Sequence, residues 1–263
     1  MDSENISILV ETIESEAIYR MHSLPAKEQM EACMGSVMRI GTITAIRTDI
    51  FPGFSVSRVM GFTKNPGELE LDEIEKFYFG RKGIFALQIP PHLIDDSVEG
   101  LLSSRGYKLK NHWARFVRDT SPIAGNKTDL EIREIKSDDD AEIFAEMVTT
   151  TFEFPKEIDP IISSTVGKDG WKFYMAYDED KPVATGCVFV NGETAWNCFA
   201  TTLTEYRGRG AQGALLSARI DFARQAGCRI ITTETHKDNA SYRNMLRYGY
   251  KVLYERPNFV YGE

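Results

Sequence analysis

A glycine-rich loop between a strand pattern and a helix pattern constrains the fold of this chain more than any other feature. Gly208, Gly210 and Gly213 fall within six residues. Arg207 and Arg209 are interleaved with them. Glycine lets a backbone turn tightly and approach a ligand closely. The first turn of a helix presents unbonded N–H groups and the positive end of its dipole. Such a loop is suited to phosphate, for which the arginines add forked donors.

The residues on either side of the loop have the periodicity of regular structure. Ala211, Leu215 and Phe222 recur at helical spacing and predict a helix directly after the glycines. Aromatic and β-branched residues predict strands at 194–202 and 229–233. The motif is therefore strand, glycine-rich loop, helix and strand.

Two familiar phosphate loops fit this segment poorly. A P-loop needs a lysine after its second glycine, and none stands here. The dinucleotide fingerprint G-x-G-x-x-G matches Gly208, Gly210 and Gly213, and Glu234 could serve as its acidic partner. However, residues 205–207 are polar where that fingerprint needs the apolar end of a strand. A nicotinamide-dependent dehydrogenase is an alternative that only NAD(H) binding would support.

Residues 207–213 and 238–250 resemble two motifs of the GNAT acetyltransferase superfamily. The acetyl-CoA pyrophosphate loop of that family has the pattern Gln/Arg-x-x-Gly-x-Gly/Ala, which Arg207 and Gly210 match. Gln212 stands where Gly or Ala is usual, and Gly213 follows one step later. Residues 238–250 resemble the family's final helix and its Gly–aromatic ending. Two motifs in the family's order make the resemblance far more specific than either alone.

The resemblance implies how acetyl-CoA would bind. The end of the strand 194–202 would hold the pantetheine arm and the thioester carbonyl through its backbone. The loop N–H groups would hold the pyrophosphate, and Asn239 would contact the CoA arm. The expected acetyl-CoA-binding residues are Ala200, Thr201, Thr202, Arg207, Gly208, Arg209, Gly210, Ala211, Gln212, Gly213 and Asn239. Asn239 has a second interpretation, because asparagine before a helix is also a common N-cap.

The resemblance also implies a reaction in which a bound amine attacks the acetyl thioester directly, without an acyl-enzyme. This chemistry needs positioned substrates and a base for the ammonium proton. Glu234 is the candidate base, because it ends the strand after the loop helix and lies five residues before Asn239. A structural carboxylate is the competing interpretation of Glu234. His236 is the second candidate base, since the ordinary pKa of histidine suits the role.

The group that would protonate the leaving thiolate is less well defined. Many family members carry a tyrosine four residues before the Gly–aromatic ending, but that position is Met245 here. Tyr242 lies three residues earlier and shares a helical face with Met245, so it is the candidate acid. Unassisted departure of the thiolate and weak catalysis are the alternatives. Weak catalysis would suit a CoA-binding sensor or interaction module on the same scaffold.

A faint internal repeat predicts two copies of one fold. Gly106-Tyr107-Lys108 recurs as Gly249-Tyr250-Lys251 and Phe116-Val117 recurs as Phe259-Val260, both at a spacing of 143 residues. We expect a degenerate N-terminal domain at 1–120, a linker at 121–128 and an acetyltransferase domain at 129–263. The expected fold class is α/β (α+β), with tandem GNAT-like mixed β-sheets flanked by helices.

Only the C-terminal copy carries the residues of a CoA loop. In the first copy, a strand expected at 54–62 and a helix expected at 69–79 enclose a segment with one glycine, one proline and acidic residues. Acidic residues suit the helix dipole but would repel a pyrophosphate. We therefore expect the N-terminal copy to bind no CoA and to form a lid, a wall of the substrate site or a dimer surface.

Composition narrows the remaining classes. A net charge of −8, spread over both halves, argues against nucleic acid as a partner. The four cysteines are scattered without a C-x-x-C pair, so we expect neither a metal site nor disulfides, and Cys198 is expected to be a buried thiol. No apolar run suggests a membrane span, and the first residues lack the basic region of a secretory signal. We expect a cytoplasmic protein that acts on a small-molecule or peptide amine, with homodimer formation left open.

Overall fold

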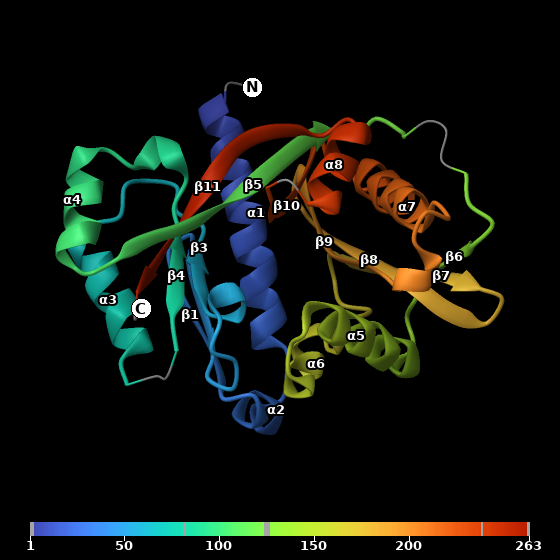
Figure 1. Cartoon of the computed structure of the whole chain (residues 1–263), viewed down its shortest axis with the longest axis horizontal. Coiled ribbons are helices and arrows are strands. Elements are labelled where there is room, and N and C mark those ends of the chain that lie inside the picture. The colour runs from blue at the N-terminus through green and yellow to red at the C-terminus, as the bar shows by residue number, and fades with distance from the viewer. Residues whose placement is uncertain (1–2, 81–82, 124–126, 238, 262–263) are drawn as a thin grey trace. The chain divides into compact units, whose positions relative to one another are not determined.

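The computed structural model describes residues 3–80, 83–123, 127–237 and 239–261, and Figure 1 labels its elements. The chain forms two compact units. The first comprises Met1–Phe116, Glu234–Arg243 and Val252–Glu263, and the second comprises Val117–Thr233 and Asn244–Lys251. Residues 124–126 of the expected linker and Asp238 of the expected last motif lie outside the described residues.

The first unit begins with a long helix and continues with short strands and helices. Its helices are α1 (Ser3–Ser23), α2 (Lys27–Ala32), α3 (Glu68–Tyr78) and α4 (Asp96–Ser104), with 3-10 turns η1 (Phe54–Val56) and η2 (Pro91–Leu93). Its strands are β1 (Gly35–Ile40), β2 (Ile43–Thr48), β3 (Arg58–Met60) and β4 (Phe85–Gln88), with most of β5 (Lys108–Asp119) and β11 (Lys251–Tyr261).

The sheet of the first unit is mixed, and the end of the chain completes it. Strands β1, β2 and β3 pair antiparallel in sequence order. Strand β4 then pairs parallel with β3. On its other side, β4 pairs antiparallel with β11, from Gln88 with Asn258 to Phe85 with Tyr261. The last strand of the chain therefore belongs to the sheet that the first strands begin.

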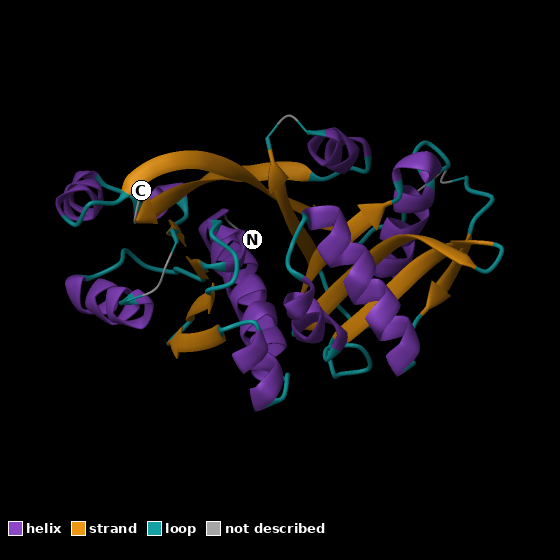
Figure 2. Cartoon of the chain, turned by 60° about the horizontal axis from the view of Figure 1, so that its bottom comes forward, coloured by secondary structure: helices purple, strands orange, loops and turns teal. Residues whose placement is uncertain are grey.

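Helices cover both faces of this sheet (Figure 2). Ile43 and Ala45 of β2 pack into an apolar core with α3 and α4. Between them, the Thr44 hydroxyl lies 2.8 Å from the Ser15 hydroxyl of α1. Because successive side chains of a strand point to opposite faces, α1 covers the face opposite α3 and α4. The face of α1 that meets the sheet is partly polar.

His22, near the end of α1, makes the stability of the first unit depend on pH. The buried ring has its Nδ1 2.9 Å from the carbonyl oxygen of Ile18, and burial lowers the pKa of His22 from 6.5 to about 4. The unfolded chain takes up a proton near pH 6.5, whereas the folded chain does so only near pH 4. Stability should therefore fall as the pH drops through this window, by about 3 kcal/mol in total at about 1.4 kcal/mol per unit.

Urea unfolding at a series of pH values between these limits measures the loss. The His22→Leu variant should lose most of this pH dependence, because it has no proton to take up. His112 is exposed, so His112→Leu should behave as the wild type does. Equal pH slopes for wild type and His22→Leu would contradict the prediction.

The second unit contains the remaining elements. Its helices are α5 (Asp138–Phe152), α6 (Asp159–Ser163) and α7 (Ala211–Gln225), with 3-10 turns η3 (Lys156–Ile158) and η4 (Thr204–Tyr206). Its strands are β6 (Glu131–Glu134), β7 (Trp171–Asp178), β8 (Lys181–Asn191) and β9 (Thr194–Thr202). Strand β10 (Ile230–His236) and helix α8 (Ala240–Arg247) contribute residues to both units.

The second sheet has the same order of pairings as the first. Strands β6 to β9 pair antiparallel in sequence order, and β10 then pairs parallel with β9. In both sheets an antiparallel run is followed by one parallel pair, across which a helix connects the strands (α3 in the first, α7 in the second). The predicted fold class of tandem mixed sheets flanked by helices is confirmed.

Helices α5 and α7 lie on opposite faces of the second sheet. Phe173 of β7 packs edge-to-face on Phe144 of α5, with ring centroids 4.9 Å apart. Its strand neighbours Tyr174 and Ala176 instead pack in one cluster with Leu215 of α7. This alternation follows from the period of two along a strand. It fixes α7, with the glycine-rich loop at its start, on one face.

Local predictions hold best where periodicity is strong. The strand expected at 194–202 is β9. Helix α5 begins at a side-chain cap, in which the Ser137 hydroxyl accepts from Asp140 N. The strand expected at 54–62 is wrong, because 54–56 form a 3-10 turn and β3 covers 58–60 only. Gly61 ends β3 with a φ of 87°, and a Cβ there would stand 2.3 Å from Thr42 O. The close approach of that loop stops the strand.

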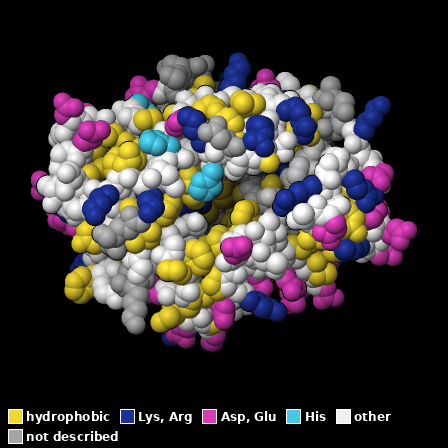
Figure 3. Space-filling model, in the orientation of Figure 1, with side chains coloured by type: hydrophobic (Ala, Val, Ile, Leu, Met, Phe, Trp, Pro, Cys, Tyr) yellow, Lys and Arg dark blue, Asp and Glu magenta, His cyan; other side chains and the backbone are white. Residues whose placement is uncertain are grey.

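The surface in Figure 3 carries both basic and acidic side chains. Among the described residues, no helix is both long and apolar enough to cross a membrane.

Candidate active site

Strand β9 carries a β-bulge where the thioester is expected to bind. The register between β8 and β9 shifts so that Phe199 and Ala200 together stand opposite Gly186. Phe199 has a φ of 49°, a left-handed conformation that is uncommon outside glycine. A bulge leaves its extra residue out of the ladder, and Ala200 is exposed. The bulge therefore interrupts the regular ladder between β8 and β9 at these two residues.

Two side chains hold the bulge in place. The Thr185 hydroxyl donates to Phe199 O at 2.9 Å. Gln212 reaches back from α7, and its Nε2 donates to Thr201 O at 2.6 Å and to Thr202 Oγ1 at 3.0 Å. Gln212 replaces the small residue of the family pattern, so its amide ties the first turn of α7 to the end of β9. The predicted residues Ala200, Thr201, Thr202 and Gln212 are therefore brought together.

Strand β10 pairs with only the first part of β9 within the second unit. The parallel ladder joins Ile230–Thr232 to residues 194–196. The next contact is made by a side chain, because the Thr233 hydroxyl donates to Asn197 O at 3.0 Å. Among the described residues of this unit, β8 is therefore the main-chain partner of β9 at the bulge.

The two glycines of the loop that have a positive φ are required there for different physical reasons. Gly210 has a φ of 83° and precedes α7 directly, and a Cβ there would stand 2.3 Å from Lys127 O. Gly208 has a φ of 85°, but no described atom lies within 4 Å of where its Cβ would be. Gly210 is needed because the chain before β6 approaches it closely. Gly208 keeps the open side of the loop clear of side chains.

Gly210→Ala is expected to destabilise the protein more than Gly208→Ala. Both substitutions meet the left-handed backbone cost of about 1–2 kcal/mol. Only Gly210→Ala adds an overlap with Lys127 O, and overpacking typically costs a further 1–3 kcal/mol or so. Chemical denaturation of both variants measures the difference. Equal losses would show that the segment at Lys127 yields without cost.

The two arginines of the loop differ in what they already bind. Arg209 Nη2 lies 2.5 Å from Asp129 Oδ2 and 2.9 Å from Asp178 Oδ1. These hydrogen bonds raise the pKa of Arg209 and lower the pKa values of Asp129 and Asp178. Arg207 is exposed, and its backbone N–H donates to Thr204 O at 3.3 Å, but its guanidinium makes no hydrogen bond or ion pair with the described residues. Only the guanidinium of Arg207 is therefore still available for a ligand in this part of the chain.

The other two predicted loop residues are buried. The side chain of Ala211 packs in the apolar cluster beneath α7, and Gly213 is buried within the same first turn. Their contribution to a ligand would come from the backbone. The backbone at a helix N-terminus is suited to binding the phosphate groups of a ligand.

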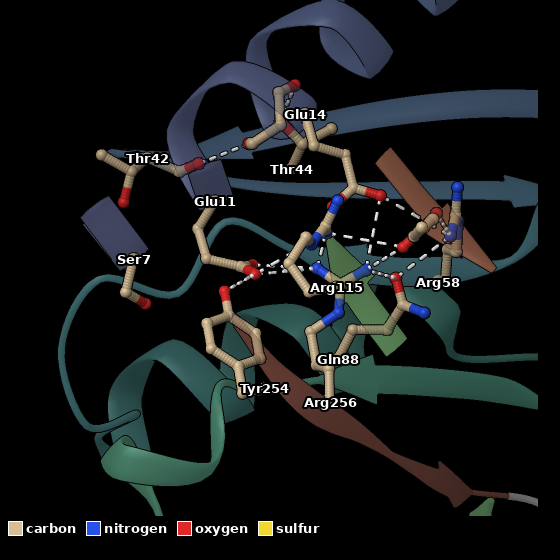
Figure 4. A network of polar contacts seen from close by, with 12 residues as sticks. Ser7, Glu11, Glu14, Thr42, Thr44, Arg58, Gln88, Arg115, Tyr254 and Arg256 are labelled. Carbon is tan, nitrogen blue, oxygen red and sulfur yellow. Dashed lines mark hydrogen bonds and ion pairs between the residues drawn. The ribbon is translucent and has the colours of Figure 1, made fainter. Parts of the chain in front are cut away.

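Glu234, the candidate base, lies in the first unit within a network of buried charges, most of whose members are labelled in Figure 4. Its Oε1 accepts from Arg58 Nη1 at 2.8 Å, and its Oε2 accepts from Arg256 Nη2 at 2.5 Å. Arg115 Nη2 lies 3.4 Å from the same Oε2. Both oxygens of Glu234 therefore already accept from guanidinium groups.

Two glutamates of α1 complete the network. Arg256 Nη1 lies 2.9 Å from Glu11 Oε2 and 2.8 Å from Glu14 Oε2, and all three side chains are at most 1% exposed. Arg115 also pairs with Glu14. Although burial raises it, the charges of Arg115, Arg256 and Arg58 hold the pKa of Glu14 well below 4.5. The three arginines and three glutamates balance, so the network is neutral as a whole.

The motifs of the sequence do not predict this network, although the residues of α1 contain a signal for it. Val10, Ala17 and Met21 recur at helical spacing, and Glu14 falls in the middle of the face they define. A carboxylate within an apolar stripe indicates a buried charge, which requires a cationic partner. The sequence does not indicate which arginines supply it.

His236, the second candidate base, follows Glu234 on β10. Its exposed side chain packs edge-on against Trp113, with ring centroids 4.9 Å apart. Burial of part of the ring lowers the pKa of His236, and the charge of Glu234 opposes that shift. With a pKa below the ordinary 6.5, the imidazole is mostly neutral at pH 7 and can accept a proton.

Asn239 and Tyr242 lie at the start of α8. Asn239 Oδ1 accepts from Tyr242 N at 2.7 Å, and Asn239 Nδ2 donates to Thr235 Oγ1 at 2.8 Å. Asn239 therefore caps α8, as its second interpretation predicts. The Tyr242 ring packs edge-to-face on Phe116 at 5.0 Å, and its hydroxyl makes no hydrogen bond with the described residues. Met245 lies one turn further along the same helix.

Comparison with known proteins agrees with this arrangement. Residues 139–250 match the acetyltransferase (GNAT) family model. No curated protein sequence matches the chain. Solved structures of similar fold include a GCN5-related N-acetyltransferase from Kribbella flavida, with a TM-score of 0.61 and 12% identity over 92% of this chain and 93% of that one.

Two further solved structures cover most of the chain. A tandem GNAT protein from the clavulanic acid biosynthesis pathway has a TM-score of 0.60 and 12% identity, over 98% of this chain and 94% of that one. A GCN5-related N-acetyltransferase from Sphaerobacter thermophilus has a TM-score of 0.60 and 14% identity, over 83% and 80%. At such low identities these likenesses show the fold alone.

The fold and the match at 139–250 together define the class as an acyltransferase. More narrowly, residues 139–250 carry a domain of the acetyltransferase (GNAT) family.

Proposed function

We propose that this protein is an acetyl-CoA-dependent N-acetyltransferase that moves an acetyl group directly to a primary amine of a small molecule or peptide. The observation that supports this most is the bulge at Phe199 and Ala200, tied by Gln212 to the first turn of α7. A bulge exposes backbone donors suited to a carbonyl oxygen. A helix N-terminus supplies donors suited to a pyrophosphate. The second unit joins the two.

The proposed reaction forms a C–N bond and breaks a C–S bond. The amine nitrogen attacks the thioester carbonyl carbon, while bulge N–H groups stabilise the oxygen as it becomes negative. A base takes the proton that the ammonium loses, and the thiolate gains a proton as it leaves. We propose Tyr242 for the second proton transfer, because its hydroxyl is not engaged with the described residues.

Two residues of β10 are proposed as the base. Glu234 has the position that the family resemblance suggests, but both of its oxygens accept from arginines. His236 has an exposed imidazole with a lowered pKa, which favours it for the proton transfer itself. In that arrangement Glu234 positions the end of β10, which carries His236.

The first copy is proposed to bind no CoA. At the start of α3, the N–H of Gly67 donates to the Glu70 carboxylate at 2.8 Å. The pKa of Glu70 is lowered by the hydrogen bond from Lys64 and by that from Gly67. A carboxylate of the chain thus occupies the helix end that a pyrophosphate would need. The division of the duplicated sequence into 1–120 and 129–263 stays a proposal.

Calorimetric titration with acetyl-CoA, with CoA and NADH as comparison ligands, tests the proposal, followed by thiol release against a panel of amines. Micromolar acetyl-CoA binding and amine-dependent thiol release would support the transferase. Failure to bind any CoA species would overturn it, and binding of NADH instead would support the dehydrogenase alternative.

A CoA-binding sensor is the second candidate function. Met245 at the usual tyrosine position and the arginine-bound Glu234 are the observations that favour it. A sensor would bind acetyl-CoA and CoA with distinct affinities yet release no thiol with any amine of the panel.

Arg207→Ala and Arg209→Ala should separate ligand binding from loop stability. We expect Arg207→Ala to weaken acetyl-CoA binding by roughly tenfold, the cost of one charge-assisted hydrogen bond. Arg209→Ala should change affinity by less than about threefold, because its guanidinium already serves Asp129 and Asp178 as an exposed pair. Calorimetry of both variants measures this. The assignment of Arg207 as the ligand-binding arginine is wrong if only the Arg209→Ala variant binds acetyl-CoA more weakly and the thermal midpoint of that variant is unchanged.

A further inference from the structure

Two cysteines face each other beside the bulge. Cys187 of β8 and Cys198 of β9 are directly opposite, and their sulfur atoms lie 2.9 Å apart. Cys187 is fully buried, whereas Cys198 is only partly buried. Both are reduced in the structure. The proposed acetyl transfer uses neither thiol.

A buried arginine accompanies this pair. Arg219 of α7 is 2% exposed, and its guanidinium lies over Gly186, where a Cβ would stand 2.9 Å from Cζ. Among the described residues no carboxylate pairs with Arg219, and its Nε donates to Leu215 O at 3.1 Å. Burial lowers the pKa of Arg219. Arg219 is therefore a buried cation beside the residue that precedes Cys187.

We propose that Cys187 and Cys198 form a peroxide-sensitive dithiol that is reversibly oxidised to a disulfide across β8 and β9. The thiolate of Cys198, the more accessible sulfur, attacks one oxygen of a peroxide. The S–O bond forms, the O–O bond breaks, and one water or alcohol leaves. The sulfur of Cys187 then attacks Cys198, so that the S–S bond forms and the S–O bond breaks with loss of water. The two thiols lose two electrons and two protons, and the peroxide is reduced.

The geometry limits this oxidation to one pair. Directly opposite residues of antiparallel strands have Cα separations of about 4.5–5.5 Å, within the range that disulfides span. Cys228 is buried, which raises the pKa of its thiol to about 11. Cys33 is fully buried in the other unit. Neither has an opposite cysteine among the residues that the structure describes.

Peroxide treatment of the purified protein tests the proposal. Hydrogen peroxide should remove two of the four alkylatable thiols, and dithiothreitol should restore them. Cleavage after Glu193, which lies between the two cysteines, should release peptides that stay joined until reduction. Absence of the joined peptides, or equal loss of Cys33 and Cys228, would overturn the proposal.

Single variants test the order of the steps. Cys187→Ser should leave a sulfenic acid on Cys198 that dimedone traps. Cys198→Ser should slow peroxide consumption by about tenfold or more, because the accessible thiolate is gone. Cys228→Ser is the matched control and should oxidise as the wild type does. Dimedone labelling of Cys198 at equal levels in wild type and Cys187→Ser would contradict a resolving role for Cys187.

The pair adjoins the bulge, so oxidation should also affect ligand binding; this consequence alone rests on the proposed function. A disulfide draws Cys198 toward β8 and displaces Phe199, the next residue. We expect the oxidised protein to bind acetyl-CoA about tenfold more weakly than the reduced protein, with no such change for Cys198→Ser. Unchanged affinity after complete oxidation would show that the disulfide does not affect acetyl-CoA binding. The joined peptides test formation of the disulfide independently of that result.

Discussion

Replacing Arg256 by methionine is expected to lower the free energy of unfolding by about 3–5 kcal/mol, the cost of breaking a buried ion network on one side. Arg256 is 1% exposed and contacts Glu11, Glu14 and Glu234. Its removal leaves three carboxylates with two guanidinium groups in a buried site. Methionine fills much of the same volume, so the loss reports charge rather than a cavity. Urea denaturation at pH 7 measures it.

Two further variants make this result specific. Arg229 is 66% exposed and pairs with Glu193 at 3.0 Å, so Arg229→Met should cost less than about 1 kcal/mol. Arg256→Met combined with Glu14→Met removes one charge of each sign and should be less destabilised than the sum of the two single variants. If Arg256→Met is no less stable than Arg229→Met, the network contributes nothing to folding.

Replacing His236 by asparagine is expected to lower kcat by about 10²–10⁴-fold with acetyl-CoA affinity preserved, the usual contribution of a positioned base. The wild-type rate should fall as the pH drops through the pKa of His236, which lies below 6.5, because only the neutral imidazole accepts a proton. The variant should lack this dependence. Assays of thiol release at a series of pH values measure both effects.

The Glu234→Gln variant discriminates between the two candidate bases. If Glu234 is the base, replacing its carboxylate by the amide of glutamine should abolish turnover, while acetyl-CoA affinity and the thermal midpoint stay unchanged. If it positions β10 through Arg58 and Arg256, the midpoint should fall and the pH profile should keep its shape. A full rate for His236→Asn together with an inactive, stable Glu234→Gln would assign the base to Glu234.

The loop and its helix could be predicted because their signals are local. The glycines, the apolar stripe after them and the β-rich run before them lie within one continuous segment, 194–225. The repeat at a spacing of 143 residues likewise predicts the matching order of the two sheets. Ser137 and Asn239 are caps that bond N–H groups three residues away, which is also local chemistry.

The roles of individual polar side chains depended on partners that sequence spacing does not reveal. Arg209 fits a phosphate loop by pattern, but Asp129, 80 residues away, and Asp178, 31 residues away, hold its guanidinium. Gln212 departs from the family pattern for a reason visible only at the bulge, where it bonds the end of β9. Each reason is a hydrogen bond to a residue of another element.

The sequence by itself determined the fold class, the position of the glycine-rich loop and the GNAT family of the domain at 139–250, because helix and strand periodicity, glycine conformation and motif order are short-range properties of the chain. Only the tertiary structure decided that Glu234 joins Glu11, Glu14 and three arginines from distant segments, and that Cys187 meets Cys198. The physical reason is that the chemical role of a buried charge or thiol depends on the protein groups that replace the water around it. Those groups come from strands and helices whose approach the local pattern does not encode.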